Sequence, residues 1–384
     1  MKFWGITGTN GKTTTTWIAA AFINAAPGRK CGYVTTVEVN TGTRQFYTGY
    51  TTPPLKQLKE IFAEMEANGC TDCVMEVSSH AIHQHRTGDT VFSGGVFTNL
   101  SEDHLDYHKT MAAYFDVKLD FARQIAAAHE TTPDMGRRDL PPYVVCLDGG
   151  YGREMFNAVG NLAVNVIPVS VSTAAYDLGQ LQLVGAYNQS NVLCAAALAE
   201  AAGVSHDAIQ AVIPTLKPRW GRLEEVFPRH QAPGTRRQAR FFVDFAHTPD
   251  GLEKVLAAAR GFTPEGKQLW VVFGAGGDRD PMKRPLMGEA CAKLADRLVV
   301  TSDNPRSEDP LKIIEAILKG VERVEKVERV EPDRKKAIEF ALMNAGEGDV
   351  VIIAGKGHET TQEIAGVKHP FDDREVVREF EIKS

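Results

Sequence analysis

Short apolar runs alternate with longer amphipathic stretches along most of this chain. The first run covers residues 2–7; a glycine-rich turn follows, and a helical pattern begins at Thr13, with Trp17 and Phe22 on its apolar side. Short apolar runs predict buried strands, whereas longer stretches with a helical period predict helices. The other predicted strands are 73–77, 94–100, 143–147, 239–246, 269–275, 297–302 and 349–355.

The predicted helices lie between these strands, at 55–68, 111–128, 191–202, 251–259, 287–294, 312–318 and 334–344. Such alternation predicts an α/β fold with mostly parallel sheets, in which ligands bind at the carboxyl ends of the strands. The length of 384 residues predicts two domains. We place their boundary within 222–228, with domains at 1–225 and 226–384, and expect surface loops at 128–142 and 228–240.

The composition narrows the function classes. A net charge of -6 and a pI near 6.0 argue against a nucleic-acid-binding surface. No apolar run reaches membrane-spanning length, and the N-terminus lacks the apolar core of a signal peptide. The six cysteines are scattered, so we expect reduced thiols in the cytoplasm. Cys70 and Cys73 form one C-x-x-C, but without a second pair chance spacing is favoured over a metal or redox site.

The turn after the first strand carries phosphate-binding chemistry. Gly8, Asn10 and Gly11 form a turn between a strand and a helix, which directs backbone N–H groups and a helix N-terminus at an anion. Lys12 is suited to reach the outer phosphates and the Thr13 hydroxyl to bind magnesium. The strict pattern G-x-x-x-x-G-K-[ST] is not met, so a plain tight loop is the alternative; the Lys-Thr pair favours nucleotide binding.

Acidic and basic side chains follow the next two strands. Glu76 closes the strand at 73–77, where a carboxylate can bind magnesium directly or through water; a surface strand end is the alternative. His104 lies in a dense polar loop, and Lys118 lies on the helix that begins near Met111. Taken alone, Lys118 would be interpreted as a solvated helix lysine, and His104 could be a loop histidine without a function.

Together the motifs resemble one family over nearly the whole chain. The Gly-Lys-Thr loop, EVSSH (76–80) and SEDHLDYH (101–108) occur in this order in the Mur ligases, as do LVGAYNQSN (183–191), WGRLEEV (220–226), VDFAHTPDG (243–251), DNPR (303–306) and GKGHE (355–359). Within that family the chain resembles the MurE type, the UDP-N-acetylmuramoyl-tripeptide synthetases. Its DNPR resembles the version of this motif in the enzymes that add meso-diaminopimelate.

The resemblance implies a P-loop-containing, mostly parallel-sheet ATPase domain, followed by a smaller Rossmann-like α/β domain that binds the amino acid. It implies ATP and Mg²⁺ as cofactors. One magnesium would be held by Thr13 and Glu76, and a second by His104 with a carbamylated Lys118. The positions that match the phosphate loop are Gly8, Thr9, Asn10, Gly11, Lys12, Thr13 and Thr14.

The other implied roles concern the two substrates and the nucleoside. Arg222 would reach the phosphates across the domain gap, and it completes the implied catalytic set with Lys12, Glu76, His104 and Lys118. The adenosine-side positions are Asn188, Asn191, Asp244 and His247; the acceptor positions are Thr51, Thr52, Ser78, Gln84 and Arg86; the amino-acid positions are Arg279, Asp303, Asn304, Arg306, Gly355 and Glu359.

The expected activity is an ATP-dependent amide ligase that activates an acceptor carboxylate as an acyl phosphate and couples it to an amino acid. Arg306 could bind the distal carboxylate of diaminopimelate through two parallel hydrogen bonds. The chain begins at the ATPase strand, so we expect it to lack the family's N-terminal uridine-nucleotide domain and to use a nucleotide-free peptide or muramyl-peptide acceptor. A small antiparallel sheet is expected to be curtailed around 169–185. Two alternatives stay open: the same chemistry in another pathway, and a Mur-like subunit that requires a separate partner chain.

Overall fold

The computed structural model describes residues 1–129, 136, 139–229 and 239–380, and it divides into two compact units, Met1–Lys217 and Pro218–Ser384. The α/β class predicted from the sequence is confirmed in both units. The division falls before the predicted boundary at 225/226, because strand β9 (Glu224–Val226) pairs with β10 (Arg240–Asp244) of the second unit. Much of the two predicted surface loops lies outside the described residues.

The first unit contains an eight-stranded sheet in the order β4-β3-β2-β5-β1-β6-β7-β8. Strand β1 is central and parallel to both β5 and β6, while β3 and β4 extend one edge as an antiparallel meander. The chain therefore leaves β1 at the point where the strand order reverses, the usual ligand-binding position in such sheets. The strands are β1 Lys2–Thr7, β2 Cys31–Val34, β3 Val39–Asn40, β4 Gln45–Phe46, β5 Asp72–Glu76, β6 Phe92–Phe97, β7 Pro142–Cys146 and β8 Asn165–Val169.

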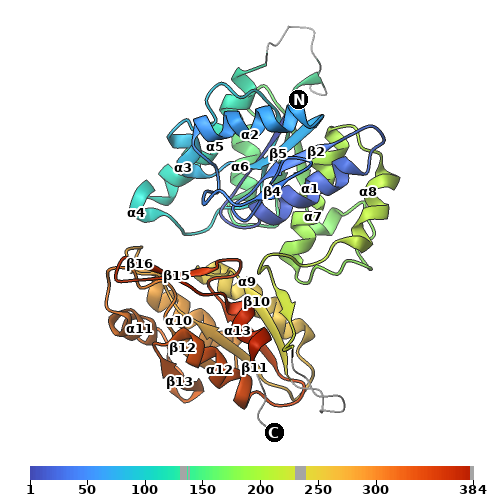
Figure 1. The fold of residues 1–384 in the computed structure, drawn as a ribbon. Coiled ribbons are helices and arrows are strands. Elements are labelled where there is room, and N and C mark those ends of the chain that lie inside the picture. The colour runs from blue at the N-terminus through green and yellow to red at the C-terminus, as the bar shows by residue number, and fades with distance from the viewer. Residues whose placement is uncertain (130–135, 137–138, 230–238, 381–384) are drawn as a thin grey trace. The chain divides into compact units, whose positions relative to one another are not determined.

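Helices cover both faces of this sheet (Figure 1). Helices α1, α7 and α8 pack together on one face, and α2, α5 and α6 enclose a buried core on the other. The helices are α1 Lys12–Asn24, α2 Leu55–Ala67, α3 Ser79–His83, α4 Leu105–His108, α5 Met111–Ala127, α6 Gly152–Val159, α7 Ala186–Ala201 and α8 His206–Val212. Between β8 and α7, where every residue is described, the only regular element is the 3-10 turn Val171–Thr173.

A buried ion pair joins β1, β5 and the loop before β2. Asp72 is 1% exposed, and its carboxylate accepts hydrogen bonds from Arg29 Nε at 2.8 Å and Trp4 Nε1 at 2.9 Å. Burial acts to raise the pKa of Asp72, but the hydrogen bonds from Arg29, Thr71 and Trp4 outweigh it, so the pKa is lowered. Folding of the first unit therefore favours the ionised form of this carboxyl.

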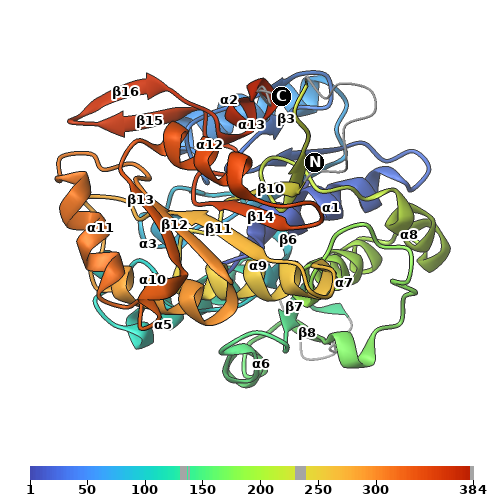
Figure 2. The same ribbon diagram turned by 90° about the horizontal axis from the view of Figure 1, so that it is seen from below.

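The second unit contains a six-stranded sheet in the order β13-β12-β11-β14-β10-β9, parallel except for β9, and Figure 2 shows β12, β11 and β14 side by side. Alternate strand residues face opposite sides: Ile352 packs with α9 to α11, and Val351 and Ile353 pack with α12 and α13. The elements are β9 and β10 as above, α9 Pro249–Phe262, β11 Leu269–Phe273, α10 Lys283–Leu294, β12 Arg297–Thr301, α11 Pro310–Leu318, β13 Val327–Glu331, α12 Arg334–Asn344, β14 Val350–Ala354 and α13 Asp373–Glu379.

A two-stranded antiparallel hairpin, β15 (Thr361–Ile364) and β16 (Val367–Pro370), follows the last strand of this sheet. The sequence pattern did not indicate it, because neither strand is an apolar run. The hairpin is not isolated, since Arg306 forms a parallel bridge with Ile364. It therefore lies against the DNPR loop.

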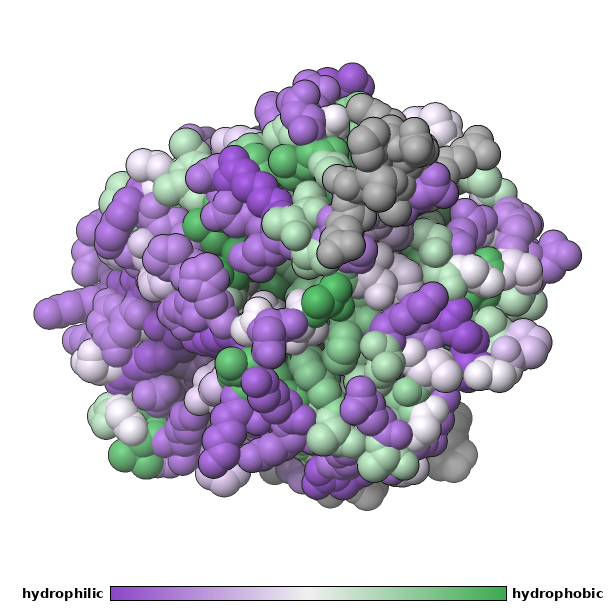
Figure 3. Space-filling model, turned by 90° about the horizontal axis from the view of Figure 1, so that it is seen from above, coloured by the Kyte–Doolittle hydropathy of each residue, from purple (hydrophilic) through white to green (hydrophobic). Residues whose placement is uncertain are grey.

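The surface shown in Figure 3 intermingles hydrophilic and hydrophobic residues. Within the described ranges, no helix is long and apolar enough to cross a membrane. Cys70 and Cys73 are both buried, and burial raises the pKa of each thiol. Among the residues that the structure describes, no three or more His, Cys, Asp or Glu side chains form a group that could hold a metal ion.

Candidate active site

The loop between β1 and α1 is closely packed, and two of its glycines are required by sterics. A Cβ on Gly8 would lie 1.9 Å from Thr98 Oγ1, and a Cβ on Gly11 would lie 2.3 Å from Asn191 Oδ1. Gly11 also has φ 84°, which side-chain-bearing residues rarely adopt. The predicted strand at 94–100 ends at Phe97 because Thr98 turns toward the loop and donates from Oγ1 to the Asn10 carbonyl at 2.7 Å. The loop backbone is thereby fixed at the N-terminus of α1.

Two lysines converge on one carbonyl of this loop. Lys12 Nζ donates to Gly8 O at 3.0 Å, and Lys118 Nζ donates to the same atom at 2.9 Å. Lys12 also bonds Thr9 O at 2.8 Å. The structure thus places Lys118, predicted from a helix far along the chain, directly at the phosphate loop.

Lys118 is unusual for a helix lysine because only 1% of it is exposed. Burial lowers its pKa well below the usual range, and the nearby Lys12 lowers it further, while Asp103 acts in the opposite direction. Its Nζ also lies 4.7 Å from the Tyr114 ring centroid. The interpretation of a solvated helix lysine is therefore wrong: this amine is buried and its neutral form is favoured.

Glu76 lies beside the first turn of α1 and is fully buried. Its Oε1 accepts from Thr13 Oγ1 at 2.8 Å and from Thr36 N at 2.8 Å, and its Oε2 accepts from Thr36 Oγ1 at 3.0 Å. The alternative of an exposed strand end is wrong. Thr36 was not predicted from the sequence. It lies two residues beyond β2, at the same end of the sheet as Glu76, and that position could have indicated a site residue.

The predicted acceptor residues form a connected network next to Glu76. Thr52 Oγ1 donates to the Glu76 carbonyl at 2.9 Å, and Ser78 N donates to Thr52 Oγ1 at 3.1 Å. Arg86 Nη1 donates to Thr52 O at 3.3 Å, and Arg86 Nε donates to Gln84 Oε1 at 2.8 Å. These residues, from the loop before α2 and from the two ends of α3, are therefore brought together with the end of β5.

His104 is held in a strained backbone conformation. Its φ of 56° is left-handed, and its backbone N donates to Asp103 Oδ1 at 2.9 Å. Its ring packs edge-on against His80 at 5.0 Å. Burial and neighbouring cations, opposed by Asp103, lower its pKa to about 4, so the imidazole is neutral at pH 7 and able to act as a ligand. Strain of this kind is often stored at functional sites.

In the second unit, five of the six predicted amino-acid residues gather at the ends of β12 and β14. The sixth, Arg279, lies in the loop after β11, where its Nη1 donates to Asp278 O at 3.0 Å. Asn304 Nδ2 donates to Glu359 Oε2 at 2.9 Å. Asp303 Oδ2 is buried, and none of the described residues hydrogen-bonds to it. A Cβ on Gly355 would lie 2.5 Å from that oxygen. The arrangement leaves a carboxylate oxygen that a bound ammonium group could satisfy.

Lys356 orients this cluster and was missed from the sequence. It is fully buried, and its Nζ donates to Glu359 Oε2 at 2.7 Å and to Asn304 Oδ1 at 3.0 Å. Because Asn304 Oδ1 accepts from Lys356, its Nδ2 is directed at Glu359. The quoted motif GKGHE contains this lysine, so the signal was present.

The residues predicted to contact adenosine lie in both units. Asn191 accepts from Thr15 Oγ1 at 3.3 Å and donates to Asn188 Oδ1 at 3.3 Å, which ties α7 to α1 in the first unit. In the second unit, Asp244 accepts from Leu223 N at 2.6 Å and Ala246 N at 2.7 Å. Adenosine contacts for these residues stay predictions.

Arg222 and His247 both lie near Phe245 in the second unit. The Arg222 guanidinium is 4.6 Å from the Phe245 ring centroid, and the His247 ring packs edge-on against it at 4.6 Å. His358 packs on the same phenyl ring at 4.9 Å. Burial, followed by the charge of Arg222, lowers the pKa of His358 to about 3. His358 is therefore neutral at pH 7, and Arg222 supplies a positive charge beside the Phe245 ring.

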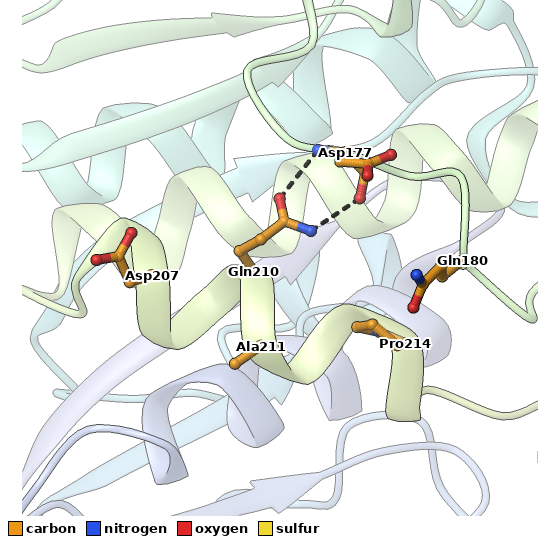
Figure 4. Close-up of a pocket in the computed structure, with 6 residues that line it drawn as sticks. All are labelled: Asp177, Gln180, Asp207, Gln210, Ala211 and Pro214. Carbon is orange, nitrogen blue, oxygen red and sulfur yellow. Dashed lines mark hydrogen bonds between the residues drawn. The ribbon is translucent and has the colours of Figure 1, made fainter.

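A separate open cavity of about 410 Å³ lies at α8 (Figure 4). Gln210 closes one side of it by accepting from Asp177 N at 2.9 Å and donating to Asp177 O at 2.9 Å. No residue predicted for the site lines it. These bonds hold the segment before α7 onto α8.

Comparison with known proteins decides the family. The Mur ligase middle domain matches residues 6–199, and the Mur ligase glutamate ligase domain matches residues 228–357. The chain belongs to the Mur ligase family. The resemblance noted from the motifs is thereby confirmed.

Individual Mur ligases are similar over nearly the whole chain. The chain is 38% identical, over 98% of its length and 76% of the relative's, to UDP-N-acetylmuramoyl-L-alanyl-D-glutamate–2,6-diaminopimelate ligase of Chromobacterium violaceum. The ligase of the same name from Geobacillus kaustophilus is 40% identical over 97% of this chain and 77% of that protein. A solved structure of such a ligase matches with a TM-score of 0.60 and 32% identity, covering 98% of this chain and 77% of that one. Escherichia coli FolC, solved with ADP, shares the fold at a TM-score of 0.61 and 19% identity.

Proposed function

We propose that this Mur ligase is an ATP-dependent acid–amino-acid ligase of the MurE type, which joins diaminopimelate to the carboxylate of a muramyl-peptide acceptor. The observation that carries the proposal is the convergence of Lys12, Lys118 and Glu76 on one phosphate-type loop, with the acceptor network of Thr52 and Ser78 at its edge. The names of the similar ligases supply the substrates.

The reaction requires activation of an unreactive carboxylate. An acceptor oxygen attacks the γ-phosphorus of ATP, the bond to ADP breaks, and an acyl phosphate forms. The neutral amine of the amino acid then attacks the acyl carbon, and phosphate leaves with its electron pair as the amine loses a proton. We expect Lys12, at the start of α1, to screen the charge that builds up during phosphoryl transfer.

The side chains around Glu76 fit a magnesium ion. A buried carboxylate and the Thr13 hydroxyl, 2.8 Å apart, offer the oxygen donors that Mg²⁺ prefers. Bound Mg²⁺ would neutralise phosphate charge. Thr36 holds both oxygens of Glu76 and thereby fixes the direction in which the carboxylate faces.

Lys118 is suited to carry a carbamate. Only a neutral amine attacks carbon dioxide, and burial beside Lys12 favours the neutral form of Lys118. The nitrogen–carbon bond forms, one oxygen takes the electron pair, and a proton is released. A neutral amine is thereby converted into an anion beside the charge of Lys12, so the carbamate pairs with Lys12 and adds an oxygen ligand near His104.

The second unit offers groups for both ends of the amino acid. Asp303 Oδ2, which accepts no hydrogen bond from the described part of the chain, and the Glu359 carboxylate are suited to an ammonium group, and Arg306 is suited to a carboxylate. Diaminopimelate has a distal carboxylate that lysine lacks. A site that provides charged donors for that group discriminates strongly against the analogue without it.

The proposal is tested by assaying each combination of acceptor and amino acid. Purified protein, ATP and Mg²⁺ are combined with UDP-N-acetylmuramoyl-L-alanyl-D-glutamate or its nucleotide-free counterpart, and with diaminopimelate, lysine, ornithine or alanine; phosphate release and product mass are followed. We expect release that depends on both substrates and is fastest with diaminopimelate. Turnover only with an unrelated acceptor, or only after addition of a second chain, would contradict the proposal.

A further inference from the structure

The DNPR loop of the second unit is fastened to strand β15 by a series of hydrogen bonds. Gln362 Nε2 donates to Asp303 O at 2.7 Å, and Glu363 N donates to Asn304 Oδ1 at 3.0 Å. Arg306 N donates to Glu363 O at 3.0 Å. Three of the four residues of the loop are thus hydrogen-bonded to the strand, and on the strand all of these bonds involve Gln362 or Glu363.

The Arg306 side chain is held from two directions. Its Nη1 donates to Gly277 O at 2.5 Å, and its Nε lies 3.7 Å from Glu363 Oε2. Among the described residues, none hydrogen-bonds to Nη2. The protein therefore engages the guanidinium at Nη1 and approaches it at Nε, and the N–H groups of Nη2 are left to donate to a ligand carboxylate.

The backbone of Arg306 is strained in the same place. Its φ of 52° is left-handed, a conformation that costs about 1 kcal/mol or more for a residue with a side chain. The bond from Arg306 N to Glu363 O and the bridge to Ile364 hold it there. Without them the loop could relax and carry the guanidinium away.

Glu363 is better explained as a support for Arg306 than as a source of stability. The side chains of Arg306 and Glu363 are 22% and 30% exposed, and ion pairs open to solvent contribute little to folding. A weak pair can still select one orientation of a long side chain, because the alternatives are close in energy. Orientation of a binding group within a fraction of an ångström is what specificity requires.

We infer that Glu363 is a positioning residue for amino-acid selection: it holds the Arg306 guanidinium toward the distal carboxylate of the incoming amino acid. This inference rests on the proposed function. The β15–β16 hairpin is then a specificity element, and Glu363 acts through Arg306 without contacting the substrate.

The test is a double-mutant cycle on Glu363→Gln and Arg306→Ala, with Glu347→Gln at an exposed position of the same unit as the matched control. For each protein, kcat and KM are measured with diaminopimelate and with lysine. Glu363→Gln should lower the diaminopimelate-to-lysine ratio of kcat/KM about tenfold, which corresponds to about 1.4 kcal/mol. The loss should appear in KM for diaminopimelate, with kcat and KM for ATP unchanged.

In the Arg306→Ala background, Glu363→Gln should have no further effect on the ratio. An equal loss in both backgrounds, or a ratio in Glu363→Gln matching that of Glu347→Gln, would overturn the inference. Wild-type protein that turns over neither amino acid would contradict the proposed function instead. Crystal structures of the wild type and Glu363→Gln then decide the inference: a guanidinium in one position in both proteins overturns it, and one displaced only in the variant supports it.

Discussion

Replacing Lys118 separates its chemical role from its structural one. Lys118→Met keeps the apolar stem and the volume but removes the amine that donates to Gly8 O at 2.9 Å. Losing one neutral hydrogen bond costs about 1 kcal/mol, and isosteric packing changes cost little, so the free energy of unfolding should change by about 1 kcal/mol or less. Removing a preorganised charged group from phosphoryl transfer lowers turnover by about 10²- to 10³-fold.

Lys118→Ala provides the matched variant, because it leaves a space where the side chain was. ATP-dependent phosphate release is measured for both variants with increasing acetate or propionate. A short carboxylate can enter the space in Lys118→Ala and replace the carbamate, so partial rescue is expected there and none in Lys118→Met. Wild-type rates in Lys118→Ala, or equal responses of both variants to acetate, would refute the carbamate and its role.

Two further predictions concern the other unit and the buried ion pair. Arg306→Ala should remove most of the preference for diaminopimelate over lysine, about a hundredfold in kcat/KM, whereas Arg323→Ala at an exposed position should not; equal use of both amino acids by the wild type would contradict this. The pKa of Asp72 is lower in the folded state than in the unfolded state. Its ionised carboxylate therefore stabilises the fold fully above the unfolded-state pKa of about 3.9, and this stabilisation is lost as the pH falls through the folded-state pKa. Asp72→Asn, which leaves the Arg29 charge unpaired, should lower the free energy of unfolding by about 2 to 3 kcal/mol at pH 7 and remove this part of the acid dependence; a matching loss in the exposed Asp89→Asn would count against the explanation.

Strands that are continuous apolar runs could be predicted from the sequence. Strands such as Val350–Ala354 are buried on both faces, so their pattern is unmistakable. The short strands Val39–Asn40 and Gln45–Phe46 and the hairpin β15–β16 have no such pattern, because they lie at an edge or outside the main sheets. Helix α7 begins at Ala186, before the predicted start at 191, since polar residues on its first turn concealed the helical period.

The motifs of the candidate site could be recognised in the sequence, but the contacts between their residues could not be predicted from it. Burial of Lys118 and its bond to Gly8 O depend on α5 packing beside β6, which no local pattern reports. Thr36 and Glu363 were missed for the same reason, because their importance comes from a partner distant in sequence: Thr36 bonds Glu76, and Glu363 lies beside Arg306. The sequence predicted residues that can carry the chemistry, whereas the residues that orient them became visible only in the structure.

The central claim is that the acceptor carboxylate is activated as an acyl phosphate, and oxygen transfer tests it most directly. The acceptor is prepared with ¹⁸O in the reacting carboxylate and incubated with ATP, Mg²⁺ and diaminopimelate, and the products are analysed by mass spectrometry. The account predicts ADP together with inorganic phosphate that carries one ¹⁸O from the acceptor. Label in AMP, or label-free phosphate accompanying peptide product, would contradict it.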